Sequence, residues 1–228
     1  MNEMTREELL QVAKPILFNT KMVLAILDGR KTVTRRAVRY KYDNTEMEMK
    51  TDKYGTRLIE IQKDIEGETY GTRKDGTTWR KIRGYIEKKP PYRRGDILYV
   101  RETFAQVAKH IFWYRSTPPK DCENILWRPS IHMPKEAARI FLQVRNVRVE
   151  RLQDMTAEDC KKEGGETDRY LDMQEEAGIC GIQCETLKDY FAYSIWDSVV
   201  PKQELNKYGW GANPWVWVIE FERLEVGE

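Results

Sequence analysis

Two stretches in the C-terminal half of the chain alternate apolar and polar residues over lengths that suit β-strands. Residues 138–152 read ARIFLQVRNVRVERL, and residues 213–224 read NPWVWVIEFERL. In a pattern with a period of two residues, successive side chains lie on opposite faces of a sheet. Asn146 interrupts the first pattern, and we expect a bulge there. These two strands predict a sheet at the centre of the fold.

The other patterned segments predict shorter elements around this sheet. PILFN (15–19) and TVTRRAV (32–38) favour strands, and TKMVLAILDG between them favours a helix capped by Thr20 and ended by Gly29. Two more helices are indicated, one at 155–165 with Thr156 as N-cap and one at 186–199. A further strand is expected from Ile97 to Phe104. Separated strands with a few irregularly placed helices predict an α+β fold with a mixed, barrel-like sheet, not a doubly wound one.

Residues 41–92 differ in character from the rest of the chain. They are polar and rich in glycine, with short possible strands at RLIEIQ and TTWRKIRGYI and a hairpin turn at KDGTT. We interpret them as an inserted β-meander within a single domain that spans residues 15–224.

Composition indicates a folded, polar protein. Of its 228 residues, 40% are hydrophobic and 33% charged, and the formal net charge is only +2. Nucleic-acid binding would therefore depend on local patches and not on the field of the whole protein. The first residues carry acids where a secretory signal is basic and apolar, and no apolar run approaches the roughly 20 residues that cross a bilayer. We expect a cytoplasmic protein that makes no use of a membrane.

The four cysteines offer little for a metal site. Cys122, Cys160, Cys180 and Cys184 show no CxxC spacing, and the chain has two histidines. Cys180 and Cys184 could be adjacent on a helix turn, but reduced structural thiols are the favoured interpretation. No metal and no other cofactor is predicted.

A cationic cluster marks the junction between the first helix and the strand that follows it. The segment AILDGRKTVTRRAV (25–38) gathers Lys31, Arg35 and Arg36 around two threonines. Three interpretations are open: a solvated strand edge kept polar against sheet addition, a phosphate grip, or the nucleophile and base of an enzyme. In the last, a desolvated lysine would take the proton of a threonine hydroxyl. Lys31 and Thr34 could meet only if Lys31 lies in the turn before the strand.

Five motifs together resemble the ASCH domain family, in particular its longer bacteriophage and prophage members. They are ILDGRKTVTRR, GDILYVRETF, SIHMPKEAARI, RVERLQDMTAEDCKKEGG and NPWVWVIEFERL. The resemblance implies a PUA-like β-barrel, a fold associated with RNA and modified bases. It also implies that Gly29, Lys31 and Arg36 form the wall of a cleft. Thr34 stands where the common form of the family often has Glu.

Small bacterial ASCH members that hydrolyse N4-acetylcytidine carry the Lys-x-x-Thr pattern that Lys31 and Thr34 match. The resemblance then implies a catalytic set of Lys31, Thr34 and Glu163, with Glu158 and Asp159 as alternative carboxylates. Whether Glu163 would donate a proton or pair with Lys31 is left open.

Five further residues are predicted to contact a ligand: Arg35, Arg36, Trp127, His132 and Asn213. Trp127 lies in the loop WRPSIHMP, where an aromatic ring could stack on a base or simply pack as part of a lid. His132 could bind ligand or make a structural hydrogen bond, and Asn213 could read a base edge or cap the final strand. Trp215 and Trp217 share a strand face and are expected in the core.

Two functions follow. One is an amidohydrolase that deacylates N4-acylated cytidine or a related nucleoside. The other is a non-catalytic PUA-like reader of RNA or modified nucleic acid in a phage or prophage context. A virion component ranks last, because the chain has no coiled coil or assembly arm.

Overall fold

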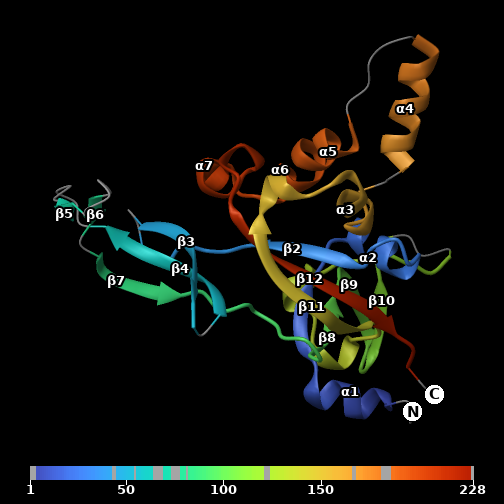
Figure 1. Cartoon of the computed structure of the whole chain (residues 1–228). Helices are drawn as coiled ribbons and strands as arrows, with labels where there is room; N and C mark the ends of the chain where they lie inside the picture. The colour runs from blue at the N-terminus through green and yellow to red at the C-terminus, as the bar shows by residue number, and fades with distance from the viewer. Residues whose placement is uncertain are drawn as a thin grey trace.

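The computed structural model shows a mixed α+β protein (Figure 1). It describes residues 4–42, 45–53, 55–63, 69–72, 78–80, 82–120, 124–165, 168–180 and 186–226. The predicted hairpin turn KDGTT lies largely outside these residues. The predicted fold class, α+β, is confirmed.

A five-stranded sheet forms the centre of the molecule. Its strand order is β1-β8-β11-β12-β2. The strands are β1 (Lys14–Leu17), β8 (Ile97–Arg101), β11 (Phe141–Arg151), β12 (Trp215–Leu224) and β2 (Val33–Ala37). β1 runs parallel to β8, and the other neighbours are antiparallel, so the sheet is mixed as expected.

The bulge predicted in the long strand is present. The register between β11 and β12 shifts between Val144 and Asn146, while ten pairs of residues from Phe141↔Leu224 to Arg151↔Trp215 hold the two strands together. β11 and β12 are therefore the central pair around which the other strands are arranged.

The sheet does not close into a barrel in the part of the chain that is described, since β1 and β2 are its two edges. Side chains link these edges where backbone pairing does not. Arg36 of β2 donates a hydrogen bond to the Leu17 carbonyl of β1 at 2.6 Å, and Tyr92 donates to the Pro15 carbonyl at 2.6 Å. The Arg36 bond therefore joins the two edges directly, while Tyr92, in the loop before β8, binds β1 alone.

Short helices surround the sheet. They are α1 (Arg6–Val12), α2 (Thr20–Leu27), α3 (Ala157–Lys162), α4 (Asp168–Cys180), α5 (Leu187–Tyr190), a π-helical stretch (Phe191–Trp196), α6 (Asp197–Val199) and α7 (Leu205–Tyr208). Short 3₁₀ turns occupy Ser130–His132, Lys135–Ala137, Leu152–Asp154, Lys202–Glu204 and Trp210–Ala212. The sequence patterns missed α1 and α4.

The predicted caps are mostly correct. Thr156 caps α3 through a reciprocal capping box with Asp159, as its sequence pattern indicated. The cap of α2 is one residue earlier than expected: Asn19 accepts from the backbone N–H of Met22, and Thr20 is already helical. Asn and Thr are both good N-caps, so the sequence alone did not separate them.

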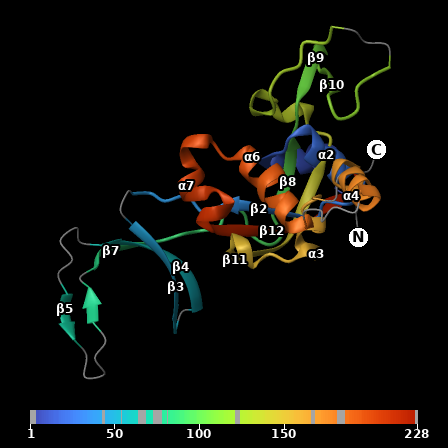
Figure 2. The same ribbon diagram turned by 90° about the horizontal axis from the view of Figure 1, so that it is seen from above.

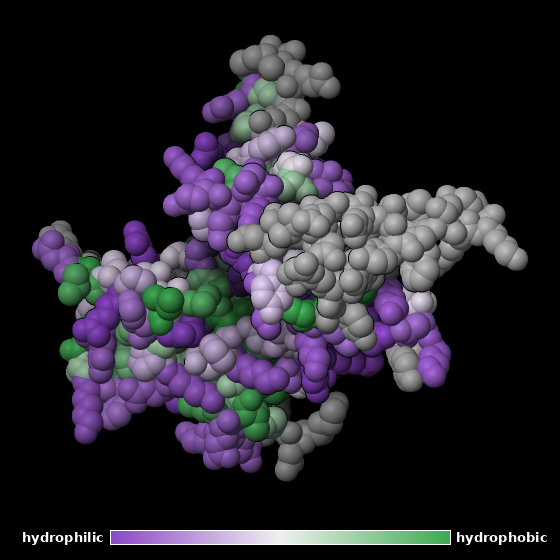
Figure 3. All heavy atoms as spheres, turned by 90° about the vertical axis from the view of Figure 1, so that its left-hand side faces the viewer, coloured by the Kyte–Doolittle hydropathy of each residue, from purple (hydrophilic) through white to green (hydrophobic). Residues whose placement is uncertain are grey.

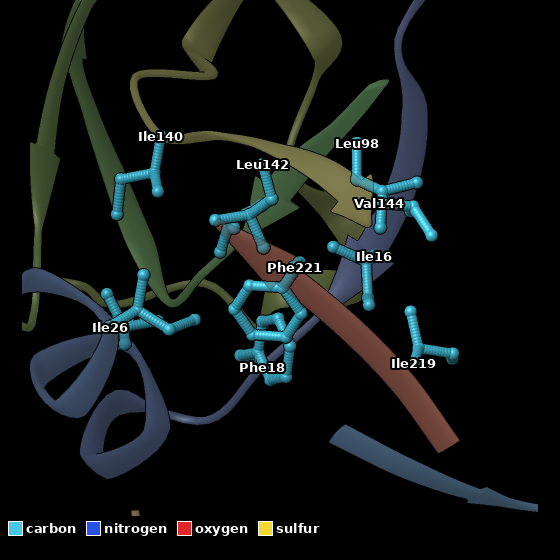
Figure 4. Close-up of a cluster of buried hydrophobic side chains, with 11 residues drawn as sticks. Ile16, Phe18, Ile26, Leu98, Ile140, Leu142, Val144, Ile219 and Phe221 are labelled. Carbon is cyan, nitrogen blue, oxygen red and sulfur yellow. The ribbon is translucent and has the colours of Figure 1, made fainter. Parts of the chain in front are cut away.

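Both faces of the central sheet are buried. On one face, α2 covers a core that includes Phe18, Ile26, Leu142 and Phe221, with the two phenylalanine rings 6.2 Å apart between centroids (Figure 4). On the other, α3, α5 and the π-helical stretch cover Val33, Val216 and Val218. A third cluster packs α1 against the hairpin formed by β9 (Phe104–Ala108) and β10 (Ile111–Tyr114). Strand β2 therefore carries buried side chains on both of its faces.

The 41–92 insert forms a separate three-stranded antiparallel sheet of β3 (Thr45–Asp52), β4 (Gly55–Lys63) and β7 (Ile82–Glu87). β5 (Thr69–Thr72) and β6 (Thr78–Arg80) pair with each other. The insert projects from the body of the molecule (Figures 1 and 2). On this side of the protein the described surface is largely hydrophilic, with small separate hydrophobic groups (Figure 3).

Trp215 and Trp217 hold the insert to the body. Both pack against Met47 and Leu58, and Trp215 Nε1 donates to the Met47 carbonyl at 3.2 Å. They pack against apolar residues as predicted, but both are half-buried at the junction with the insert and not in the core.

Candidate functional site

Lys31 lies in the turn between α2 and β2. Its N–H donates to the Ala25 carbonyl at 2.9 Å, Gly29 ahead of it adopts a φ of 73°, and β2 starts only at Val33. The backbone of Lys31 also forms an isolated antiparallel bridge with Glu163, at the end of α3. Lys31 therefore lies in the turn before the strand, as the hypothesis of a Lys31–Thr34 contact requires.

The Lys31 side chain is completely buried and fully hydrogen-bonded. Its relative exposure is 0%, and Nζ donates to the Glu163 carboxylate oxygen Oε2 at 2.6 Å, the Val33 carbonyl at 2.7 Å and the Glu163 carbonyl at 2.9 Å. An ammonium group has three N–H donors, so all are used. Burial lowers the pKa of Lys31, although the Glu163 charge opposes this change.

Glu163 is the carboxylate that reaches Lys31. Its Oε2 accepts from Lys31, and its Oε1 accepts from Arg35 Nη1 at 3.3 Å. Of the alternatives, Glu158 pairs with Lys162 at 4.0 Å on the surface, and Asp159 lies 3.5 Å from Arg35 Nη2. Glu163 is therefore the ion-pair partner of Lys31.

Gly164 allows α3 to end against Lys31. Its φ is 79°, and an added Cβ would lie 2.9 Å from the Ala25 Cβ and 3.4 Å from the Lys31 Cβ. A side chain here would separate α3 from α2 and disturb the Lys31–Glu163 bridge. The Gly164-Gly165 pair after the predicted helix was the sequence signal for this close approach.

Arg35, predicted as a ligand contact, is buried and bound to carboxylates. Its side chain is 0% exposed, and Nε and Nη2 donate to Glu150 Oε1 at 3.0 and 2.8 Å. Burial alone would lower its pKa, but Glu163, Glu150 and Asp159 together raise it above the ordinary value. Arg35 points to the α3 side of β2, where carboxylates enclose it.

Thr34 is also buried, at 3% exposure, and pairs with Ile219 of β12. Its alternation with Val33 and Arg35 places it on the face of β2 that carries the α2-covered core. Within the described residues, no hydrogen bond joins the Thr34 hydroxyl to Lys31. The contact on which the nucleophile–base hypothesis depends is therefore not formed here.

Arg36 shares this face and lies beside Phe18. Its guanidinium carbon is 5.3 Å from the centroid of the Phe18 ring, and the Lys31 Nζ is 5.6 Å from the same centroid. Burial lowers the pKa of Arg36, with Glu163 opposing. Phe18, which was not predicted as a site residue, thus lies between Lys31 and Arg36. Arg36 is partly exposed, whereas Lys31 and Arg35 are buried.

The remaining predicted residues lie elsewhere. Asn213 adopts a φ of 45°, and its Oδ1 accepts from the backbone N–H of Gln153 at 2.9 Å, so it stabilises the turn before β12. Trp127 is half-buried and His132 is exposed on the loop that leads to β11. In the described part of the chain, neither forms a hydrogen bond or ion pair with Lys31, Thr34 or Glu163.

Of the four cysteines, the structure describes the side chain of Cys160. Cys160 is a free, buried thiol on α3, and burial raises its pKa to about 11. This agrees with a structural thiol. Cys122, Cys184 and the Cys180 side chain lie outside the described residues.

Fold and site together define an α+β protein with a buried, lysine-centred charge network between an edge strand and a short helix. No model of a known protein family, no curated protein and no solved structure matches the chain. No helix in the described residues is both long and apolar enough to cross a membrane.

Proposed function

We propose that the chain is a hydrolase that removes an acyl group from a modified nucleoside of the N4-acylated cytidine type, with Thr34 as nucleophile and Lys31 as base. This proposal retains the resemblance to ASCH proteins and their PUA-like fold as its source for the substrate class. The observation that carries it is the completely buried Lys31–Glu163 pair three residues from a buried threonine.

Burying this pair is costly. Each ion loses several kcal/mol of hydration, and apolar residues of similar volume often give equal or better stability. The core of an α+β protein has no general need for a buried lysine, so a chemical role accounts for Lys31 better than a contribution to stability does. The lowered pKa of Lys31 favours loss of its proton, as a general base requires.

The proposed reaction has two steps. The Thr34 hydroxyl adds to the acyl carbonyl carbon while neutral Lys31 takes the hydroxyl proton. The exocyclic amine of the cytosine then leaves and takes that proton from Lys31. Water then hydrolyses the threonine ester, which releases the acid and restores the hydroxyl. Glu163 and Arg35 keep Lys31 in place.

Lys31 must change its hydrogen bonds to act in this way. The ammonium form donates to three acceptors, whereas the neutral amine has two N–H donors and one lone pair. Deprotonation would release one acceptor and allow the lone pair to face Thr34. Catalytic hydrogen bonds often tighten only when substrate is bound.

Two alternatives lose support. A solvated strand edge does not fit, because Lys31 and Arg35 are buried. A reader that neutralises phosphate with Lys31 loses support because all three N–H donors of Lys31 already bind Val33 and Glu163. Since Thr34 is also buried, the hydrolase requires the residues that cover β2 to open for the substrate. The remaining competitor is a purely structural ion-pair network.

Incubation with a panel of acylated nucleosides, followed by mass spectrometry, tests the proposal. We expect turnover by the wild type and its loss in Thr34→Val, which removes the hydroxyl but keeps the shape. The matched control is Thr32→Val, at an exposed threonine two residues away, which should retain activity. No turnover of any substrate by the wild type, or equal turnover by Thr34→Val, would leave the network purely structural.

A further inference from the structure

The carboxylate of Glu163 is shared between two cations, and its two contacts are unequal. Oε2 accepts from Lys31 Nζ at 2.6 Å, whereas Oε1 accepts from Arg35 Nη1 at 3.3 Å. All three side chains are buried, so water screens these contacts little. The strength with which Glu163 binds Lys31 therefore depends on where the Arg35 guanidinium lies.

Glu150 binds Arg35 from the other side. Its Oε1 accepts from Arg35 Nε at 3.0 Å and from Nη2 at 2.8 Å, and both bonds are shorter than the 3.3 Å bond to Glu163. Asp159 adds a contact of 3.5 Å to Nη2. The Arg35 guanidinium is thus positioned mainly by Glu150, with the longer bond left for Glu163.

The register of the central sheet explains how Glu150 reaches Arg35. Val218 of β12 is the register partner of Arg35 on one side and of Arg148 on the other. Glu150 follows Arg148 by two residues, so it lies on the same face of β11. Its second oxygen, Oε2, accepts from Arg148 Nε at 3.1 Å. Glu150 therefore bridges two arginines that lie on either side of β12.

Charges of alternating sign thus run from the buried base to the surface. In order, they are Lys31, Glu163, Arg35, Glu150, Arg148 and Glu220. Side-chain exposure is 0% at Lys31 and Arg35, 18% at Glu150 and 37% at Arg148. A change of charge at Glu150 is therefore transmitted to Lys31 through hydrogen-bonded groups that are shielded from solvent.

We propose that Glu150 is a positioning residue for the Lys31 base: it binds Arg35, and this contact determines how firmly Glu163 binds Lys31. The inference rests on the proposed function, since only a base requires such adjustment. While Arg35 stays with Glu150, Glu163 favours the ammonium form of Lys31. When Arg35 moves toward Glu163, it neutralises part of that carboxylate charge, and the neutral amine that the reaction requires is favoured.

The other charged groups that face this site are already bound elsewhere. Burial lowers the pKa of Lys31, Glu163 opposes this change, and the charges of Arg36 and Arg35 add to it. Arg36 donates to a backbone carbonyl of β1, and its position does not depend on Glu150. Asp159 approaches Arg35, but its Oδ2 accepts from the backbone and the hydroxyl of the helix cap. Glu150 is therefore the group through which Arg35 can be adjusted.

NMR of the lysine Cε signals measures the ionisation of Lys31 directly and needs no substrate. The Lys31 signal is the one that is missing in Lys31→Arg. Glu150→Gln keeps the shape of the side chain and removes its charge, so we expect the Lys31 pKa to fall. The expected fall is about 0.5–1 unit, less than the 1–3 units that a charge in direct contact produces, because Glu150 acts through Arg35 and Glu163.

The sign of this change separates the proposed role from a structural one. If Glu150 only held the network together, its loss would admit water and return the Lys31 pKa upward, toward the ordinary lysine value. A fall therefore requires that Arg35 has moved toward Glu163. An unchanged or higher Lys31 pKa in Glu150→Gln would overturn the inference.

Glu220→Gln provides a milder variant at the surface, which tests the proposal even if Glu150→Gln does not fold. The Glu220 side chain is 36% exposed and pairs with Arg148. Without it, Arg148 binds Glu150 more firmly, Arg35 is released toward Glu163, and the Lys31 pKa should again fall, by a smaller amount.

The matched control is Glu222→Gln. Glu222 also lies on β12, is 47% exposed and pairs with Arg145 of β11. It removes one carboxylate from a surface pair outside the network, so the Lys31 pKa should stay at the wild-type value at physiological salt. A fall in Glu222→Gln equal to that in Glu220→Gln, or no fall in Glu220→Gln, would overturn the inference.

Turnover of an acylated nucleoside provides the second readout. The pH at which the rate rises should be lower in Glu150→Gln than in the wild type by the same amount as the Lys31 pKa. A Lys31 pKa that responds as expected in a protein without turnover would refute the hydrolase and leave the coupling between Glu150 and Lys31 in place. Turnover with an unchanged Lys31 pKa in Glu150→Gln would refute the role of Glu150 alone.

Discussion

Lys31 and Glu163 are 132 positions apart in the chain and contact each other through both backbone and side chain. The backbones form an antiparallel bridge, and Nζ binds both the carbonyl and the carboxylate of Glu163 at 2.9 and 2.6 Å. This double contact fixes the end of α3 against the turn before β2. It follows that a change in either side chain also acts on how the helix is held.

Glu163→Gln should therefore destabilise the protein strongly. It leaves Lys31 buried without its counter-ion, and breaking a buried pair from one side costs about 3–5 kcal/mol. Chemical denaturation measures the change in the free energy of unfolding. Glu158→Gln, on the same helix but with a side chain 66% exposed, is the control and should change little.

A double variant distinguishes the loss of the ion pair from the effect of leaving one unpaired charge buried. Lys31→Met with Glu163→Leu removes both ions, while Arg35 retains Glu150. Most of the stability lost in Glu163→Gln should return, because two apolar groups leave no unpaired charge in the core. A double variant as unstable as the single one would show that the bonds to Val33 and to the Glu163 backbone matter more than the ion pair.

Gly164→Ala should also destabilise the protein. A φ of 79° is unfavourable for alanine, and the new Cβ would meet that of Ala25 at 2.9 Å. We expect a loss of about 1–3 kcal/mol in thermal or chemical unfolding, the usual cost of such a backbone position. Gly178→Ala on α4, where nothing lies within 4 Å of the added Cβ, should be neutral or stabilising.

The insert should lose stability in acid because of Glu60. This side chain is 1% exposed and accepts hydrogen bonds from Thr45, from the backbone of Lys41 and Tyr42, and from Lys88. Burial alone would raise its pKa, but these bonds lower it from 4.5 to about 2. A lowered folded-state pKa gives stabilisation that is complete above about 4.5 and is lost as pH falls toward about 2.

The size of this effect is roughly 3 kcal/mol at neutral pH, given 1.36 kcal/mol for each pKa unit. Hydrogen exchange of β3 and β4 amides, corrected for intrinsic rates, should show protection falling through this acid range. Glu60→Gln should lower protection at neutral pH and flatten its pH dependence. Glu48→Gln, at an exposed position of β3, should behave as wild type. Identical pH profiles for Glu60→Gln and wild type would assign the acid sensitivity to other groups.

The sequence predicted local features well where their cause is local. The Thr156 cap and the irregularity near Asn146 depend on neighbouring residues alone, and both are present. Alternation along TVTRRAV also places Thr34 and Arg35 on opposite faces of β2. It could not show that both faces are buried, because that depends on α3 docking from a distant part of the chain. The burial of Arg35 among carboxylates was therefore not predicted.

Distant contacts were predicted only through resemblance. Lys31 and Glu163 were named together for that reason, and spacing within either segment carries no information about the other. Phe18 and Glu150 were missed as members of the site, since an apolar strand residue and a charged strand residue are ordinary where they stand. The role of Phe18 depends on how the edges β1 and β2 approach each other, and that of Glu150 depends on β11 and β2 lying on either side of β12.

Lys31→Arg tests whether the lysine is a base or only a charge. Arginine keeps the positive charge but does not lose its proton in proteins, so turnover of an acylated nucleoside should fall by orders of magnitude. In the wild type, the rate should rise with pH as Lys31 deprotonates, at a pH below the ordinary lysine value because burial lowers its pKa. If Lys31→Arg folds and retains turnover, Lys31 is not the base, and the buried pair serves only to hold α3 against β2.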